Sequence, residues 1–242
     1  MIMHISSYRS KPYIYIVKVP DSIEEKQIQS FLHILPKEEK RRLLRIKNKK
    51  SFYQSLLGKI LIRYVLIKNY NYTLNNINIR LGEFGKPYLA DTNNINFNIA
   101  HSHNLVAAIF DNLHTVGIDI EKKVNIDLGI IGGVFCDFER DVFEAKSVNE
   151  KLDYFYDIWT LKECYLKNIG KGLSVPLTSF GFKKINSNYV IDNRDEESYK
   201  FENYDVNTNY LLSTCVNNLD FNSSELLHLN IDIFKNFIIK EL

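Results

Sequence analysis

Two carboxylates spaced two residues apart, Asp119 and Glu121, are the side chains of this sequence best suited to hold a cation. They lie in a stretch from Val116 to Lys122 in which apolar residues alternate with Gly117 and these two acids. A period of two predicts a β-strand with one buried face, and it places both carboxylates on the other face, roughly 7 Å apart between Cα atoms. Such a pair repels unless a cation lies between its members, and Mg²⁺ bound to substrate phosphates is one such cation. A solvated strand neutralised by the two lysines that follow is the alternative interpretation.

A predicted helix over residues 150–170 offers a third carboxylate. Trp159, Glu163 and Lys167 recur every four residues, on a side of this helix other than its apolar stripe. A tryptophan on that side favours packing against another element rather than exposure. If the side faces the strand, Glu163 joins Asp119 and Glu121. The alternative is an ordinary surface ion pair between Glu163 and Lys167, worth about 0.3–0.5 kcal/mol.

The composition is that of an ordinary globular protein. With 242 residues, 45% of them hydrophobic, the chain is long enough for one large domain or two small ones. A formal net charge of +2 gives no global reason to expect nucleic acid as a partner. The three cysteines form no CxxC pair, which is typical of a reduced, cytoplasmic protein and argues against a cysteine zinc site. Residues 1–20 show no signal peptide, and no apolar run reaches the ~20 residues of a membrane span.

The pattern of elements repeats in the two halves of the chain. Each half has a long amphipathic helix, over residues 51–69 and 150–170, together with short alternating segments typical of antiparallel strands. The alternating segments are residues 77–81, 96–101 and 105–111 in the first half and 180–185, 199–204 and 210–216 in the second. We therefore predict an α+β fold of two similar subdomains in a pseudo-twofold arrangement, each a long helix packed on a small antiparallel sheet. The expected boundaries are residues 1–115 and 116–242.

A basic run and a glycine-rich loop complete the features of the first half. From Lys37 to Lys50 there are eight basic residues and two acidic ones, which fits either a solvated face or a phosphate-binding surface. The loop over residues 82–87 holds two glycines, and Pro87 restricts Lys86 to extended geometry. This loop could therefore approach a ligand closely through its backbone.

Four segments in this order resemble the surfactin-synthetase-type 4′-phosphopantetheinyl transferases. They are Gly85-Lys86-Pro87, the FNIAHS run at residues 97–102, the strand at 116–122, and the WTLKECYLK run at 159–167, which continues into GKGLS at 170–174. The resemblance covers roughly residues 36–176. It implies a pseudo-twofold pair of α+β subdomains, a site in the cleft between them, and transfer of 4′-phosphopantetheine from coenzyme A (CoA) to a serine of an apo carrier protein.

The resemblance also implies roles for individual residues. Asp119, Glu121 and Glu163 would hold Mg²⁺ at the CoA pyrophosphate, and Glu163, directly or through a water, would take the proton of the attacking serine. Lys167 would protonate the departing 3′,5′-ADP. The residues that would contact CoA are Arg42 and Ser55 at the 3′-phosphate, Lys86, Pro87 and His101 at the phosphates and nucleotide, and Lys162 and Lys167 at the pyrophosphate.

Two departures from the family pattern affect these assignments. Ala100 stands where a serine is common before the motif histidine, which removes one hydroxyl that could donate to phosphate. Glu39 falls where a cationic contact is expected, so another basic residue between Lys37 and Arg45 is an alternative to Arg42 at the 3′-phosphate.

Three alternatives remain open from the sequence. A nucleic-acid-binding module would use the basic run, although no recognised binding signature accompanies it. A non-catalytic CoA-binding relative would bind without turnover. A zinc site would use His101 and His103, with no cysteine or third histidine nearby in the sequence. Because the two halves already supply both sides of the cleft, we expect a monomer. The composition favours a cytoplasmic protein with no membrane and no nucleic acid as partner, and the resemblance implies CoA and a carrier protein as its partners.

Overall fold

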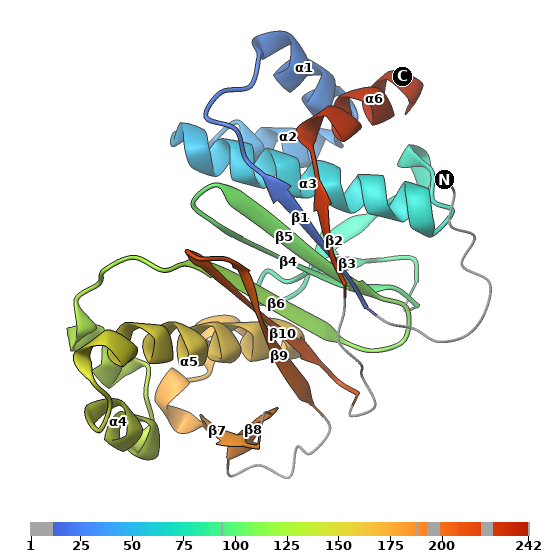
Figure 1. Ribbon diagram of the computed structural model, residues 1–242. Coiled ribbons are helices and arrows are strands. Elements are labelled where there is room, and N and C mark those ends of the chain that lie inside the picture. Colours follow the sequence, from blue (N-terminus) through green and yellow to red (C-terminus); the bar gives the residue numbers. More distant parts are fainter. Residues whose placement is uncertain (1–11, 93, 187, 193–198, 219–224, 242) are drawn as a thin grey trace.

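The computed structural model describes residues 12–92, 94–186, 188–192, 199–218 and 225–241. Its elements form four layers, in which two sheets face each other and helices cover the outer face of each (Figure 1). The predicted α+β class, with a long helix packed on each of two small, mainly antiparallel sheets, is confirmed. Within the described residues, none of the helices combines the length and the apolar character that a membrane span requires.

The first sheet has the strand order β11-β1-β5-β4. Its strands are β1 (Tyr13–Lys18), β4 (Asn96–Ser102), β5 (Leu105–Asp111) and β11 (Leu226–Leu229). All neighbours pair antiparallel except β11, which runs parallel to β1. The helices on its outer side are α1 (Glu25–His33), α2 (Lys37–Leu43), α3 (Lys49–Asn69) and α6 (Ile231–Glu241) (Figure 1).

Helix α3 is the predicted long helix of the first half. The side chain of Asn48 caps it by accepting a hydrogen bond from the backbone N–H of Ser51 at 2.9 Å. Its apolar stripe, including Leu56, Ile60 and Leu61, is fully buried against the sheet. A one-turn 3₁₀ helix (Leu74–Asn76) and a separate two-stranded sheet of β2 (Ile79–Leu81) and β3 (Pro87–Leu89) follow it.

The second sheet has the strand order β6-β10-β9-β8-β7, antiparallel throughout. Its strands are β6 (Val116–Lys122), β7 (Gly181–Ile185), β8 (Asn188–Asp192), β9 (Lys200–Asn207) and β10 (Tyr210–Val216). Helix α5 (Val148–Ile169) lies across the outer face, preceded by the 3₁₀ segment Leu128–Gly133 and by α4 (Asp137–Glu144). Two short 3₁₀ segments, Gly172–Ser174 and Leu177–Ser179, lead into β7. Gly170 ends α5 with a left-handed φ of 70°, a conformation that glycine adopts readily at the C-terminal end of a helix.

Strand β6 alternates as predicted. Val116, Ile118 and Ile120 are fully buried in the core between the two sheets, where Ile109 and Leu212 also lie. The other face of β6, which carries Gly117 and the two acids, therefore points toward α5. This orientation makes β6 the strand that connects the shared core to the candidate site.

The C-terminal segment corrects one predicted boundary. The sequence assigns all of residues 116–242 to the second subdomain, but β11 pairs with β1, with Leu226 opposite Ile14. Phe234, Phe237 and Ile238 of α6 are buried in the same core as α3. The physical reason is that β1 would otherwise expose an unpaired edge and α3 an uncovered apolar side. Residues 226–241 thus complete the first sheet; the boundary near residue 115 remains a prediction, and residues 1–11 lie outside the described chain.

Candidate active site

Gly117 allows strand β6 and helix α5 to approach closely. A Cβ atom at this position would lie 1.9 Å from the carbonyl oxygen of Cys164 and 2.7 Å from the backbone nitrogen of Asn168. Because a side chain is excluded here, the neighbouring acid on the strand comes within reach of the helix. The Nζ of Lys167 lies 2.6 Å from Oδ1 of Asp119.

Three carboxylates meet at this contact. Asp119 is only 4% exposed, and its buried Oδ2 has no hydrogen-bond partner among the residues that the structure describes. Burial, and then the charge of Asp119, raise the pKa of Glu121, although hydrogen bonds from Ser102 and Trp159 oppose this. Burial also raises the pKa of Glu163, where Asp119 and Glu121 add to the effect. The predicted trio of acids is thus brought together, and its negative charges destabilise one another.

Lys167 offsets part of this charge. Burial alone would lower the pKa of its ammonium, but Asp119, Glu163 and Glu121 outweigh burial and raise it. Lys167 therefore stays protonated at neutral pH. It provides a positive charge at the position where the sequence predicts a cation between carboxylates.

The donor set suits Mg²⁺. Within the described residues, no three histidine, cysteine or acidic side chains already have the spacing that holds an ion. The chemistry nevertheless fits, because Asp119, Glu121 and Glu163 supply carboxylate oxygens only, and in the described part of the chain nothing donates to the buried Oδ2 of Asp119. Since Lys167 now contacts Oδ1 of Asp119, a bound ion would share or replace that contact.

Strand β4 forms the other side of the site. Oγ of Ser102 donates to Oε2 of Glu121 at 2.7 Å, and the backbone N–H of Ile118 donates to Oδ1 of Asn98 at 3.0 Å, so β4 runs alongside β6. Neighbouring protein atoms displace part of the water around the imidazole of His101, which lies at the surface; this effect, and next the charge of Lys167, lower its pKa. The sequence reasoning missed Ser102 and Asn98; their signal was period-two spacing on the strand that carries the motif histidine.

Comparison with known proteins adds the deciding observation. A profile described as "4'-phosphopantetheinyl transferase superfamily" matches residues 115–215, and one described as "4'-phosphopantetheinyl transferase, N-terminal" matches residues 22–111. The 4'-phosphopantetheinyl transferase Sfp of Bacillus subtilis (strain 168) is 32% identical over 210 residues, which cover 86% of this chain and 93% of Sfp. The chain belongs to the 4′-phosphopantetheinyl transferase family. The transferase gsp of Aneurinibacillus migulanus is 36% identical to this transferase over 208 residues, covering 83% of this chain and 86% of gsp.

One solved structure resembles part of this transferase. The holo-[acyl-carrier-protein] synthase of Thermotoga maritima overlaps 44% of this chain and 64% of its own, with a TM-score of 0.38 and 16% sequence identity. A likeness of that size supports no conclusion about the site.

Lys162 is the clearest disagreement between the sequence prediction and the structure of this transferase. Its side chain is fully buried on the core side of α5, where Nζ lies 2.6 Å from Oε2 of Glu139. The same Nζ donates to the carbonyl oxygens of Val134, Leu177 and Phe180 at 2.8, 2.7 and 2.8 Å. With its donors occupied in the interior, Lys162 is not available to line a pyrophosphate. It anchors α5 to the segments around α4 instead.

The predicted 3′-phosphate residues lie on the helices of the first half. Arg42 is exposed on α2, and Ser55 is half-buried on α3. Gln54, beside Ser55, donates from Nε2 to the carbonyl oxygen of His103 at 2.7 Å, so this part of α3 passes over the β4–β5 turn. No contact joins Arg42 to the carboxylate cluster among the described residues.

Glu39, which the sequence marks as a departure from the family pattern, has a structural role. Its carboxylate lies 2.6 Å from the guanidinium of the fully buried Arg63 and 3.0 Å from Nζ of Lys59. Burial opposes ionisation, but Arg63 and Lys59 together lower the pKa of Glu39. These ion pairs fasten α2 to α3, and Lys37, Arg41 and Arg42 of α2 are exposed at the surface.

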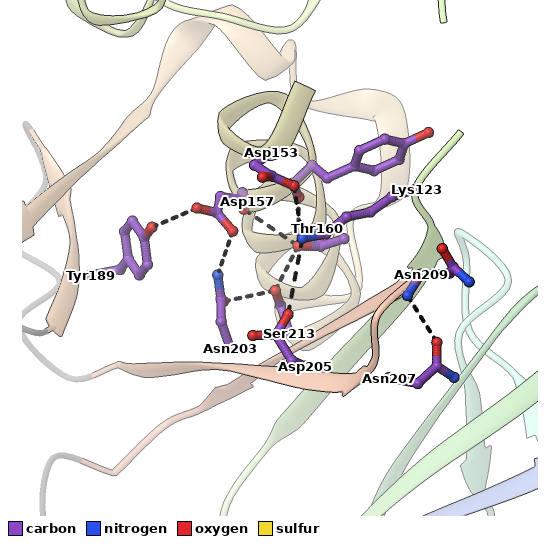
Figure 2. Close-up of polar contacts among 11 residues, drawn as sticks. Lys123, Asp153, Asp157, Thr160, Tyr189, Asn203, Asp205, Asn207, Asn209 and Ser213 are labelled. Atoms are coloured by element: carbon purple, nitrogen blue, oxygen red, sulfur yellow. Dashed lines mark hydrogen bonds and ion pairs between the residues drawn. The ribbon is translucent and has the colours of Figure 1, made fainter. Parts of the chain in front are cut away.

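Another flank of α5 carries a separate polar network (Figure 2). Asp157 accepts hydrogen bonds from Tyr189 at 3.1 Å and Asn203 at 3.4 Å, and Ser213 donates to Asn203 at 2.8 Å and lies 2.6 Å from Oγ1 of Thr160. A groove of about 550 Å³ opens beside this network, and none of the predicted site residues lines it. The network holds α5 against β8, β9 and β10, and its Ser213 lies opposite Asp119 in the pairing of β10 with β6.

Lys86 gives a pH-dependent expectation. Burial lowers its pKa from the ordinary 10.5 to about 8. Between about pH 8 and 10.5, the Lys86 amine is protonated in the unfolded chain but largely neutral in the folded one. The contribution of Lys86 to the free energy of unfolding therefore rises with pH across that range. We expect the free energy of unfolding of the wild type, relative to that of Lys86→Met, to rise by on the order of 1–3 kcal/mol between about pH 8 and 10, as measured by urea denaturation. A difference that stays constant with pH would contradict the lowered pKa.

Proposed function

We propose that this protein transfers the 4′-phosphopantetheine group of CoA to a serine hydroxyl of an apo carrier protein and releases 3′,5′-ADP. Membership of the transferase family supports the reaction class. The observation that carries the finer proposal is the meeting of Asp119, Glu121 and Glu163 with Lys167 beside strand β4. Such a site suits a reaction in which a pyrophosphate is held and a hydroxyl proton removed.

The reaction requires one bond to form and one to break. The serine oxygen attacks the β-phosphorus of CoA, and the bond from that phosphorus to the bridging oxygen breaks, so that 3′,5′-ADP departs with the oxygen. Mg²⁺ held by the three carboxylates would neutralise charge on the pyrophosphate. Phosphoryl transfer of this kind depends on positioning and charge stabilisation, so no protein nucleophile is required.

The chain's own side chains would handle the protons. Glu163 has a raised pKa, which brings its basicity closer to neutral pH and suits it to accept the serine proton. Lys167 remains protonated through its three acidic neighbours and would donate to the departing oxygen. The acid and the base thus lie one helical turn apart on α5.

We also propose where CoA and the carrier protein bind. The exposed basic residue Arg42 and Ser55 would receive the 3′-phosphate, while His101 and the loop that holds Pro87 would contact the rest of the nucleotide. Because both halves supply parts of the site, the protein would act as a monomer. It would be cytoplasmic and have no nucleic-acid or membrane partner.

One experiment tests the reaction directly. The protein is incubated with CoA, Mg²⁺ and an apo carrier protein, and the carrier is analysed by mass spectrometry. The expected result is a phosphopantetheine adduct on the carrier serine that disappears when a chelator removes the metal. Tight CoA binding with no adduct on any carrier would instead indicate a non-catalytic CoA-binding protein.

Asp119→Asn tests the metal assignment. Loss of one carboxylate ligand should weaken Mg²⁺ binding at least about tenfold, which a titration followed by the fluorescence of Trp159, the single tryptophan, would measure. Repulsion among the acids alone would predict a more stable metal-free protein. Since the half-buried Lys167 loses its charged partner, we expect the opposite: the free energy of unfolding of the metal-free protein should fall by roughly 1–3 kcal/mol. Unchanged Mg²⁺ affinity would remove Asp119 from the ligand set.

A further inference from the structure

We propose that Lys86 and Asn168 are positioning residues that clasp the C-terminal end of α5, so that Glu163 and Lys167 stay opposite Asp119. The catalytic consequence of this clasp rests on the proposed function. The clasp itself is a property of the ligand-free protein and can be tested without any reaction.

Lys86 reaches from the first half of the molecule into the second. It lies in the loop between β2 and β3, and its Nζ donates to the carbonyl oxygen of Asn168 at 2.7 Å and of Val116 at 3.1 Å. Its aliphatic stem runs beside Gly170, where an added Cβ would lie 3.5 Å from Cδ. One side chain therefore joins the start of β6, the end of α5 and the β2–β3 loop.

Asn168 fastens the same helix end to two strands. Its side chain is 4% exposed, and its Nδ2 donates to the carbonyl oxygens of Thr115 at 3.0 Å and Cys215 at 2.8 Å. Thr115 directly precedes β6, and Cys215 lies in β10. Asn168 directly follows Lys167 in the sequence, so any shift of Asn168 moves Lys167 relative to Asp119.

The chemistry of the helix end favours this arrangement. The last carbonyl oxygens of a helix have no intrahelical partner and carry partial negative charge, so a cationic donor is stabilising there. Lys86 supplies that donor to the carbonyl of Asn168, while the strand carbonyl of Val116 takes a second N–H. The ammonium is thus engaged by the protein itself, which differs from the role in CoA binding that the sequence predicts for Lys86.

Small displacements of the clasped end should have large effects. A misplacement of about 1 Å in a reacting group costs on the order of 10²-fold in rate. The contact between Lys167 and Asp119 is 2.6 Å long, and Glu163 is one turn before Lys167. Loosening the helix end therefore affects kcat more than the affinity for CoA.

The test compares Lys86→Met, which keeps the stem and removes the N–H donors, with Lys86→Arg, which keeps donors and charge. For Lys86→Met we expect at least tenfold faster hydrogen exchange of the amides at residues 168–171 in the ligand-free protein. We also expect a kcat at least tenfold lower and a CoA Kd, from calorimetry, within about threefold of wild type. Lys86→Arg should recover most of kcat, and Asn168→Ala should reproduce the faster exchange.

The control is Lys240→Met, which removes one exposed positive charge on α6, far from α5, and should change none of these quantities. If Lys86→Met raised the CoA Kd tenfold or more but left hydrogen exchange and kcat unchanged, the clasp proposal would be wrong. Lys86 would then be a CoA-binding residue, as the sequence predicts. If Lys86→Met does not fold, Lys86→Leu, which also lacks an N–H donor, takes its place with the same criteria.

The two proposals fail in distinguishable ways. Hydrogen exchange and CoA affinity are measured without a carrier protein, so they decide the clasp even if no carrier is modified. Absence of transfer by the wild-type protein would refute the proposed function and leave the exchange result standing. Transfer by the wild type with unaltered exchange in Lys86→Met would refute the clasp alone.

Discussion

Glu163→Gln is expected to lower kcat at least about a hundredfold while the protein folds normally and still binds CoA. Glutamine keeps the shape of the side chain but removes the negative charge and the proton acceptor. Loss of a general base alone costs ~10²–10⁴-fold in rate. Because Glu163 is partly buried among Asp119 and Glu121, losing its charge also relieves repulsion, so stability should not fall. Steady-state kinetics with an apo carrier protein measure kcat, and calorimetry measures the affinity for CoA.

A magnesium titration separates the two roles of Glu163. Higher Mg²⁺ should recover only part of the lost rate, since added metal restores occupancy but supplies no base. Complete recovery would show that Glu163 acts as a ligand only. Asp153→Asn is a matched control, because it makes the same acid-to-amide change on α5 at a side chain that is 64% exposed and pairs with Lys123. Its kcat should equal that of the wild type.

The placement of the acids was predictable because it depends on local periodicity. Alternation along residues 116–122 fixed which side of β6 carries Asp119 and Glu121, and spacing by four fixed the side of α5 that carries Glu163 and Lys167. What periodicity leaves open is which element each side faces. Lys162 shows this limit, since it adjoins Glu163 in the sequence but lies about 100° around the helix, where Glu139 and three carbonyls enclose it.

The return of the chain to the first sheet could not be inferred from local pattern. The partner of β11 depends on which sheet edge is left unpaired in three dimensions, and its partner β1 lies near the other end of the chain. Asn168 and Ser102 were missed for a related reason. Both are short polar residues whose partners, Thr115, Cys215 and Glu121, are distant in the sequence. Spacing along the chain can mark the strand face that carries Ser102, but it identifies the partner of neither residue.

Gly117→Ala is expected to destabilise the fold by about 3 kcal/mol or more. The molecules of this variant that do fold should also lose most of their activity. The added Cβ would lie 1.9 Å from the carbonyl oxygen of Cys164 and 2.7 Å from the backbone nitrogen of Asn168. Both are backbone atoms of α5, so no side-chain rotation relieves the clash and the helix must move away from β6. That movement lengthens the 2.6 Å contact between Lys167 and Asp119, on which the site geometry depends.

Urea denaturation and kinetics on the same preparation measure the two effects of Gly117→Ala. Gly132→Ala is the matched control, because an added Cβ there meets no atom within 4 Å and its backbone φ is not in the left-handed region. The control should change stability by less than about 0.5 kcal/mol and leave kcat unaltered. If Gly117→Ala were as stable and active as the control, strand and helix would have room to separate without disturbing the acids. The close approach at Gly117 would then not be what holds Asp119 against Lys167.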